Sequence, residues 1–240
     1  MVTDLTSNYA SPAGKEFTLV AGRYAGVSPS STILDAGCGY GDGVCNLAKE
    51  FRCRADAIDI NPINITSAQE QAEERRLSHL INFIKGDVRT HDFEDKKYDL
   101  VIAEGGLLSF LGRKEGLSLL ADQLDDRGWL AFSDLILLTD EGNIPKEILS
   151  VFDHNEYNYE NENTYRALLE EQGLDVHIMT LVPQSGWDNY YAHMVRRLDD
   201  KEGFFASSFV KEHFHHEIDT FYRLEGYRYV GYLFGLVRKR

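Results

Sequence analysis

Short apolar runs that end on polar or glycine residues recur along the chain. The first lies at 33–36, where Ile33, Leu34 and Ala36 precede a series of alternating glycines. Such a run, bounded by turn residues, is typical of a buried strand in a parallel sheet. Apolar residues then occur at 44, 47, 48 and 51, which is the spacing of one helix face. The pattern predicts a strand, a glycine loop and a helix, in that order.

The same alternation continues toward the C-terminus. Strands are predicted at 54–60, 81–85, 98–103, 129–135, 174–181 and 229–238, and helices at 17–25, 62–77, 113–124, 145–152 and 164–172. Strands that alternate with helices indicate an α/β fold with a mostly parallel, doubly wound sheet. The connection 182–228, between the last two predicted strands, is much longer than the about 2–5 residues that join the two strands of a hairpin. We expect inserted helices there, at about 188–198 and 205–222.

The glycine loop after the first strand indicates the kind of ligand. Gly37, Gly39 and Gly41 allow close backbone approach, and free N–H groups at the next helix start favour an anionic group. A nicotinamide-binding loop would carry its third glycine where this chain has Asp42. Asp35 and Asp42 would also repel a pyrophosphate. S-adenosylmethionine suits the loop better, because its sulfonium and α-ammonium groups are cationic and it has a single carboxylate.

Asp59 ends the next predicted strand. An acid at the carboxyl end of a neighbouring strand can accept hydrogen bonds from both hydroxyls of a ribose. The alternative is an acid that caps the following helix, but Asn61 already fills that role, with Pro62 in the first helical turn. We therefore expect Asp59 to bind the cofactor ribose.

The series Asp35-x-Gly37-x-Gly39-x-Gly41 resembles the glycine motif of the class I S-adenosylmethionine-dependent methyltransferases. The resemblance implies a Rossmann-like, doubly wound sheet of seven strands whose last strand is antiparallel. We expect a single domain over residues 1–240, with a cofactor-binding core at 30–140. A helical lid is expected at 183–228, inserted between strands six and seven. A tight turn without a ligand is the alternative interpretation of the loop.

The resemblance also implies the cofactor contacts. A carboxylate at Asp87 holds the exocyclic amine of adenine, and the N–H group of Val88 meets a ring nitrogen. Tyr9 belongs to a segment that often folds over the cofactor in this family, although such segments are also loose termini. The expected cofactor-binding residues are Tyr9, Asp35, Gly37, Cys38, Gly39, Gly41, Asp59, Ile60, Asp87, Val88 and Glu104.

Glu104 follows strand 98–103, at the edge where ligands of open α/β sheets bind. Members of the family that methylate amino groups of nucleic acids carry an Asn- or Asp-Pro-Pro stretch at this point, and this chain has Glu104-Gly105-Gly106. A Glu-Gly pair at this point resembles the sequence of an uncharacterised prokaryotic subgroup of small-molecule methyltransferases. Glu104 and Asp134 together resemble part of the metal site of the metal-dependent catechol methyltransferases. The rest of that pattern is missing, so we expect no metal. A surface turn acid is the alternative for Glu104.

The expected insert carries an aromatic cluster. In our hypothesis Trp187, Tyr190 and Tyr191 form an apolar wall beside the acceptor, and His193 takes a proton. The alternative is that these aromatic residues belong to the core, as is usual on a short amphipathic helix. The catalytic candidates are Glu104, Tyr190 and His193.

Cysteine and histidine patterns give little support for metal or disulfide chemistry. Cys38, Cys45 and Cys53 are odd in number and form no C-x-x-C pair. His213 and Glu217 are spaced i and i+4 on a predicted helix, but two such ligands rarely make a metal site without a third.

Charge narrows the possible partners. The 240 residues include 25 Lys and Arg against 39 Asp and Glu, a net charge of −14. Such a field opposes phosphate backbones and anionic membrane surfaces. No apolar run approaches the roughly 20 residues that span a bilayer, and the first residues lack the blocks of a signal peptide. We expect a cytoplasmic protein that binds neither nucleic acid nor membrane.

These features predict methyl transfer from S-adenosylmethionine to a small-molecule acceptor. Three alternatives stay open at this point. The first is a non-catalytic S-adenosylmethionine-binding protein, and the second is an RNA methyltransferase, which the net charge disfavours. The third is a nicotinamide-dependent oxidoreductase, which would bind a dinucleotide more tightly than S-adenosylhomocysteine.

Overall fold

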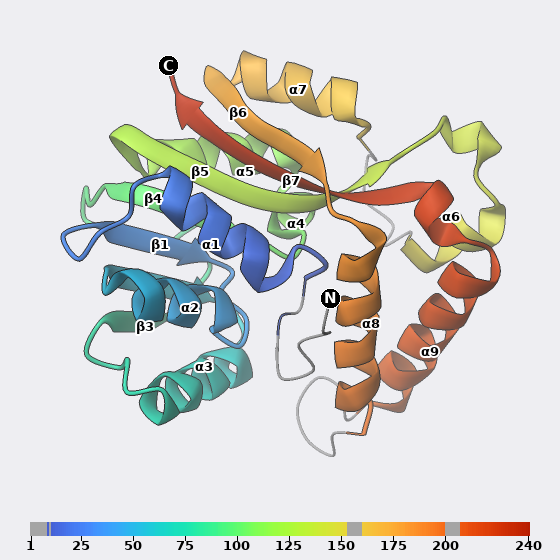
Figure 1. Cartoon of the computed structure of the whole chain (residues 1–240), viewed down its shortest axis with the longest axis horizontal. Coiled ribbons are helices and arrows are strands. Elements are labelled where there is room, and N and C mark those ends of the chain that lie inside the picture. The colour runs from blue at the N-terminus through green and yellow to red at the C-terminus, as the bar shows by residue number, and fades with distance from the viewer. Residues whose placement is uncertain (1–8, 10, 153–159, 200–206) are drawn as a thin grey trace.

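The fold is a seven-stranded sheet with helices on both faces, seen in a computed structural model that describes residues 9, 11–152, 160–199 and 207–240. The strands run in the order β3-β2-β1-β4-β5-β7-β6 (Figure 1). Their bounds are β1 (Thr32–Ala36), β2 (Arg54–Asp59), β3 (Ile81–Lys85), β4 (Tyr98–Ala103), β5 (Leu124–Leu137), β6 (Leu174–Leu181) and β7 (Val230–Lys239). Strand β7 pairs antiparallel with both β5 and β6, and the pairs among β1 to β5 are parallel. The predicted fold class and the antiparallel last strand are confirmed.

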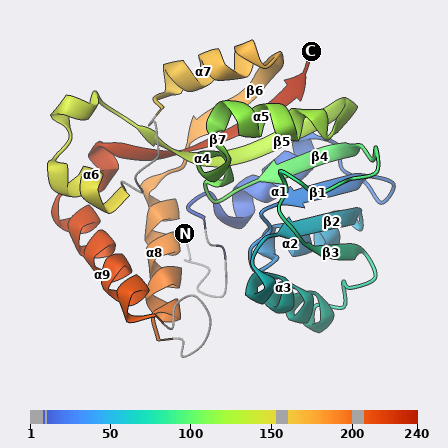
Figure 2. The same ribbon diagram turned by 180° about the vertical axis from the view of Figure 1, so that it is seen from behind.

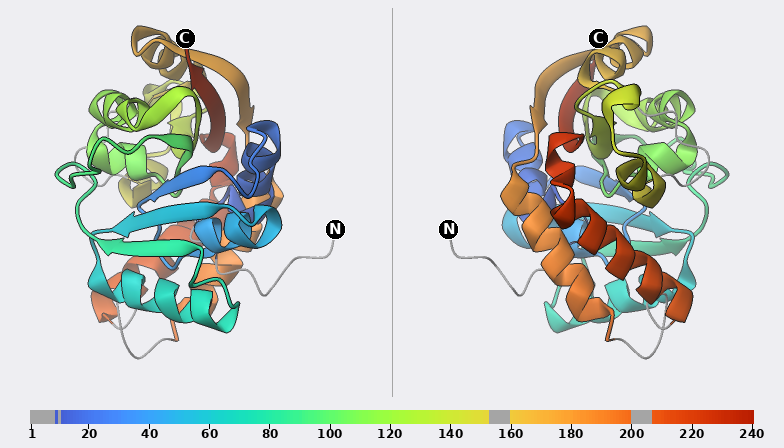
Figure 3. Two further views of the ribbon diagram at one scale, coloured as in Figure 1. Left: turned by 90° about the vertical axis from the view of Figure 1, so that its left-hand side faces the viewer. Right: turned by 90° about the vertical axis from the view of Figure 1, so that its right-hand side faces the viewer.

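Helices cover the two faces of this sheet. Their bounds are α1 (Gly14–Tyr24), α2 (Asp42–Phe51), α3 (Pro62–Glu74), α4 (Leu107–Leu111), α5 (Arg113–Asp122), α6 (Lys146–Phe152), α7 (Glu162–Glu171), α8 (Gln184–Arg197) and α9 (Ser208–Arg223). Helices α1 and α2 lie on one face and α5 on the other, as Figures 2 and 3 show from behind and from the two sides.

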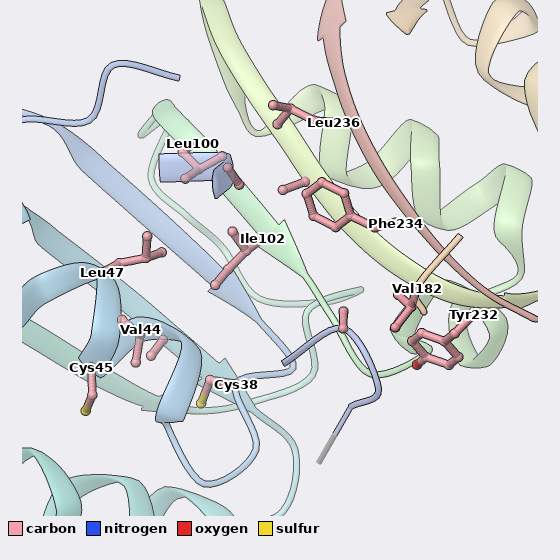
Figure 4. Packing of buried hydrophobic residues seen from close by; sticks show 14 of the residues in the cluster. Cys38, Val44, Cys45, Leu47, Leu100, Ile102, Val182, Tyr232, Phe234 and Leu236 are labelled. Carbon is pink, nitrogen blue, oxygen red and sulfur yellow. The ribbon is translucent and has the colours of Figure 1, made fainter. Parts of the chain in front are cut away.

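The core follows from the alternation of side chains along the strands. In β4, Leu100 and Ile102 pack with α1 and α2, whereas Val101 joins the cluster that contains α5 and α7. Figure 4 shows part of the first cluster, with Val44 and Leu47 of α2 beside β1 and with Leu100 and Ile102 on the neighbouring β4. Because both faces are covered, the central strands read as continuous apolar runs rather than alternating ones.

The start of strand five lies five residues before the predicted one. The turn-like sequence Asp125–Gly128 was expected to precede strand five, yet β5 begins at Leu124. The pairing with β4 shifts register between Tyr98 and Leu100, and this irregularity absorbs the extra residues. A Cβ atom at Gly128 would lie 2.6 Å from the carbonyl oxygen of Tyr98, so a glycine is needed there.

The connection between β6 and β7 holds the two predicted helices, α8 and α9. They run side by side at the carboxyl edge of the sheet, next to α6 (Figures 1 and 3). An aromatic cluster joins them, in which Trp187 of α8 and Phe221 of α9 have ring centroids 4.8 Å apart. Phe152 of α6 and Tyr232 of β7 also contact Trp187. We call α8 and α9 the insert.

Candidate cofactor and acceptor site

A cavity of about 760 Å³ opens at the carboxyl edge of the sheet. This volume lies within the range of about 300–1,000 Å³ that is usual for small-ligand pockets. Ten residues expected to contact the cofactor line it: Tyr9, Asp35, Gly37, Cys38, Gly39, Asp59, Ile60, Asp87, Val88 and Glu104. Segments far apart in the sequence therefore meet at one site.

The glycine loop forms the floor of the cavity. The N–H groups of Gly37 and Cys38 both donate to the carbonyl oxygen of Ile58, at 2.8 and 3.0 Å, which ties the loop to β2. Gly39 has φ +52°, and a Cβ atom built on it would meet nothing within 4 Å. Gly41 is not among the lining residues; it has φ +83° and lies so close to α3 that a Cβ atom would be 2.8 Å from that of Ala68. Gly39 thus leaves the floor open to a ligand, whereas Gly41 allows α2 and α3 to pack.

Asp59 lies between the loop and the start of α3. Its Oδ2 accepts from the N–H group of Gly39 at 2.9 Å, and its Oδ1 accepts from the N–H group of Asn61 at 2.8 Å. The amide of Asn64 donates to the same Oδ1 at 3.2 Å. Asn61 caps α3 through the N–H group of Ile63, as the sequence indicated. The Asp59 carboxylate is thereby fixed in orientation, and it still lines the cavity.

Asp87 is held by a neighbour that the sequence analysis did not consider. The Arg89 guanidinium donates from Nε to both carboxylate oxygens, at 2.9 and 3.0 Å, and from Nη2 to Oδ2 at 2.6 Å. These hydrogen bonds lower the pKa of Asp87. An adenine amine that binds Asp87 must therefore share the carboxylate with Arg89, which also lines the cavity.

Asp35 and Glu104 form a pair of carboxylates beside the loop. A Cβ atom on Gly43 would lie 3.2 Å from Oδ2 of Asp35 and 3.6 Å from Oε2 of Glu104, so both oxygens surround the same point. Asp35 accepts from the N–H group of Val44 in α2 at 3.1 Å, and Glu104 accepts from the Thr18 hydroxyl at 2.8 Å. Burial raises the pKa of Glu104 to about 7. Burial and, next, the charge of Glu104 raise the pKa of Asp35 well above its usual range.

The chemistry of these two acids fits a cationic ligand group. Within the described part of the chain, neither Asp35 nor Glu104 forms an ion pair. Two carboxylates that lack a cation and lie in a poorly solvated place are costly to ionise. A ligand ammonium or sulfonium group between them would remove that cost.

The segment before α1 closes one side of the cavity. Tyr9 is buried; its hydroxyl donates to the carbonyl oxygen of Asp42 at 3.5 Å and accepts from the Asn46 amide at 3.2 Å. Ser11 also lines the cavity, and its hydroxyl lies 3.3 Å from that of Ser133 on β5. The part of this segment that the structure describes is therefore docked on the cavity rather than loose.

The insert contributes different residues from those expected. Tyr190 lines the cavity, together with Met194 of α8 and Phe214 of α9. Trp187 and Tyr191 do not, because both are buried in the aromatic cluster between α8, α9 and β7. These two residues are core, as the alternative interpretation held.

His193 is not brought to the cavity either. It is 2% exposed and does not belong to the cavity lining, so the prediction that it takes a proton from the acceptor has no geometric support. The reason is the helical phase: Tyr190 and Met194, four residues apart, share the face toward the cavity, and His193 lies beside that face. His193 is therefore a buried residue of the insert.

Asp134 is buried and bound by three neighbouring side chains. Arg113 donates to its Oδ2 at 2.7 Å, Tyr165 donates to the same oxygen at 3.2 Å, and the Ser109 hydroxyl donates to Oδ1. It does not line the cavity with Glu104. Among the described residues, no group of three or more His, Cys, Asp or Glu side chains is arranged to hold a metal ion.

Several residues at the site escaped the sequence analysis. Thr18 binds Glu104 across 86 positions, a contact with no local signal. Met194 had one signal, its spacing of four residues from Tyr190 on the same helix. Phe110 and Phe214 had none, because the sequence does not say which side of a helix faces a cavity.

A family model described as a methyltransferase domain matches residues 33–128. This segment runs from β1 into β5 and supplies most of the cavity lining. The described ranges contain no helix with the combined length and apolar character that a membrane crossing requires.

Proteins of similar sequence match part of the chain. An uncharacterised protein of Haemophilus influenzae is 28% identical over 129 residues, which cover 53% of this chain and 51% of that protein. The sterol 24-C-methyltransferase ERG6 of Saccharomyces cerevisiae is 33% identical over 79 residues, 33% of this chain and 21% of that enzyme. The chain thus spans about half or less of the length of these relatives.

A solved structure shares the fold over nearly the whole chain. A methyltransferase of Thiobacillus denitrificans, solved with S-adenosylhomocysteine, superposes with a TM-score of 0.80 at 21% identity and covers 99% of this chain and 96% of that one. The chain therefore has the class I methyltransferase fold, and its residues 33–128, which include the glycine motif, match the methyltransferase-domain model.

Proposed function

We propose that this protein transfers the methyl group of S-adenosylmethionine to a small-molecule acceptor. The observation that carries the proposal is the pair Asp35 and Glu104, two acids without a cationic partner among the described residues, beside a glycine loop that is open at Gly39. A cofactor with a cationic sulfur and an ammonium group fits this pair of carboxylates, and a dinucleotide pyrophosphate does not.

The lining residues that contact the cofactor in this proposal have separate roles. Asp59 accepts from the ribose hydroxyls, and Asp87 accepts from the adenine amine beside the N–H group of Val88. Ile60, which is 63% exposed beside the cavity, covers an adenine face. Asp35 and Glu104 neutralise the ammonium group. When bound, S-adenosylmethionine supplies an activated methyl group on its sulfonium.

The protein then has to align the acceptor and exclude water. Tyr9 and Ser11 close one side, and Tyr190 and Met194 close the other. Alignment alone is worth up to about 7–11 kcal/mol in favourable cases, so no strong acid or base is required. In this proposal the insert acts as a lid over the acceptor end of the cavity.

The named relatives support a small acceptor. The yeast enzyme acts on a sterol by its name, and a 25% identical protein of Actinopolyspora halophila is a glycine, sarcosine and dimethylglycine N-methyltransferase. The net charge of −14 favours the same conclusion over an RNA substrate.

Calorimetry and a labelled-methyl assay test the proposal. S-adenosylhomocysteine should bind more tightly than NAD, and the labelled methyl group of S-adenosylmethionine should appear on a member of a panel of amines, phenols and thiols. Tighter binding of NAD would refute the cofactor. Binding of S-adenosylhomocysteine with transfer to bulk RNA and to no small molecule would support an RNA methyltransferase instead. Binding with no transfer to either would leave the non-catalytic alternative.

A further inference from the structure

The lining of the cavity divides by element into a polar part and an apolar part. The carboxylates come from the glycine loop and the strand ends. The described lining residues on helices α4, α8 and α9 are apolar or aromatic, and they are Leu107, Phe110, Leu111, Tyr190, Met194 and Phe214. We call these six side chains the acceptor wall.

The acceptor wall is supported from behind. Tyr190 contacts Tyr191, with ring centroids 5.2 Å apart, and Tyr191 packs on the buried Phe221. Met194 belongs to a buried cluster that joins α8 and α9 and includes Phe214. The wall therefore keeps its shape without a ligand, which favours tight binding because little side-chain freedom is lost.

The wall also has an open side. Phe110 is 70% exposed although it lines the cavity, so it lies at the opening. An aromatic side chain of this size in contact with water and beside an apolar cavity is typical of a ligand-binding surface.

Charge restricts what can occupy this part of the cavity. Five lining side chains are acids, Asp35, Asp42, Asp59, Asp87 and Glu104, and of these Asp42 pairs with Arg75 at 2.8 Å. In the described lining the one basic side chain is Arg89, and its guanidinium is bound to Asp87. The acceptor wall, as far as the structure describes it, carries no basic side chain, so a phosphate or carboxylate on the acceptor would lie near these acids without a cationic partner from the wall.

We infer that the acceptor is an apolar molecule without an anionic group, an apolar amine or phenol in chemical class, whose ring or hydrocarbon body lies on the acceptor wall. This inference rests on the proposed function and adds the substrate class to it. The wall selects by apolar contact, and the acids select against anions. Phe110, Met194 and Phe214 are then residues that determine specificity.

Three naphthalene probes test the inference on the full chain saturated with S-adenosylhomocysteine. 1-Naphthol and 1-naphthylamine should bind, and 1-naphthyl phosphate should bind at least tenfold more weakly. Replacing Met194 or Phe214 by Ala should weaken 1-naphthol about tenfold or more, because each removes buried apolar contact. The affinity for S-adenosylhomocysteine should stay within about twofold of the unaltered protein.

Control variants keep the result decisive. Phe209, on the same helix as Phe214, is 77% exposed and does not line the cavity, so Phe209→Ala should change neither affinity. Phe110 is exposed, so the Phe110→Ala protein should fold normally, and its affinity for 1-naphthol should fall about threefold. Circular dichroism checks the fold of each variant.

The outcomes separate the two proposals. Failure of S-adenosylhomocysteine to bind refutes the proposed function. If it binds, equal or tighter binding of 1-naphthyl phosphate, or no binding of any naphthalene probe, overturns the substrate class. Binding of 1-naphthol that is unaffected by Met194→Ala, Phe214→Ala and Phe110→Ala overturns the location on the acceptor wall.

Discussion

The cofactor part of the cavity and the insert are built in different ways. The glycine loop is fixed by backbone hydrogen bonds, such as those from Gly37 and Cys38 to Ile58. In the insert, Tyr190, Met194 and Phe214 are held by packing on other side chains. Backbone bonds tolerate many side chains and preserve one geometry, whereas packing changes with each residue. This difference fits the proposed function, in which the cofactor part serves a chemistry shared by many proteins and the insert serves a particular acceptor.

The largest expected effect comes from the packing of the insert. Trp187→Ala removes the centre of the aromatic cluster with Phe221, Phe152 and Tyr232. The free energy of unfolding should fall by about 3–5 kcal/mol, measured by urea denaturation. Phe209→Ala is the matched control and should change it by less than about 0.5 kcal/mol. A Trp187→Ala protein of unchanged stability would show that the cluster does not support the insert.

The same contrast explains what the sequence predicted. Asp35, Gly39 and Asp59 were found because a glycine loop and an acid at a strand end place groups through the backbone alone, at the edge that parallel topology defines. The seven strands followed from their short apolar runs. These features depend on local sequence and on the order of the elements.

The insert shows the limit of that reasoning. Its helices were predicted near their observed positions, but Trp187, Tyr191 and His193 were assigned to the acceptor site and are buried elsewhere. An amphipathic helix between two packed layers has apolar side chains toward both, and periodicity does not distinguish a core from a cavity. Contacts such as that of Thr18 with Glu104 depend on tertiary packing.

A second prediction concerns the cofactor part. Asp59→Ala should weaken the binding of S-adenosylhomocysteine by about 100-fold, because charge-assisted hydrogen bonds contribute about 1.5–3 kcal/mol each. Calorimetry measures the change. Asp175→Ala removes an exposed acid that pairs with Arg240 and should leave the affinity unchanged. A folded Asp59→Ala protein with normal affinity would contradict the ribose assignment.

A third prediction uses the pKa of Glu104, which is about 7 in the folded chain against an ordinary 4.5. The folded state therefore favours the protonated acid, and stability is lost as the pH rises from about 4.5 to 7. Without cofactor, Glu104→Gln should raise the free energy of unfolding at pH 8 by about 2 kcal/mol and much less at pH 5. Its affinity for S-adenosylhomocysteine should fall about tenfold at pH 8, because the ammonium group needs the ionised carboxylate.

Glu217 provides the matched acid in the insert. Burial raises its pKa to about 7 as well, and Tyr191 donates to its Oε1 at 3.0 Å. Glu217→Gln should also stabilise the chain at pH 8, but its affinity for S-adenosylhomocysteine should equal that of the unaltered protein at pH 6 and at pH 8. Equal loss of affinity in both variants would mean that the Glu104 effect is not local to the cofactor.

The smallest expected effect lies where the two regions meet. Arg197, in the last turn of α8, places its guanidinium carbon 4.2 Å from the ring centroid of Tyr40, which belongs to the glycine loop and lines the cavity. A cation–π contact at a partly exposed site contributes about 0.5–1 kcal/mol. Arg197→Gln should therefore lower stability by no more than about 1 kcal/mol and weaken the binding of S-adenosylhomocysteine two- to fivefold. A double-mutant cycle with Tyr40→Leu isolates the contact. A coupling energy near zero would mean that the insert and the glycine loop bind their ligands independently, whereas a coupling of about 0.5 kcal/mol or more would mean that cofactor binding helps to fix the acceptor wall.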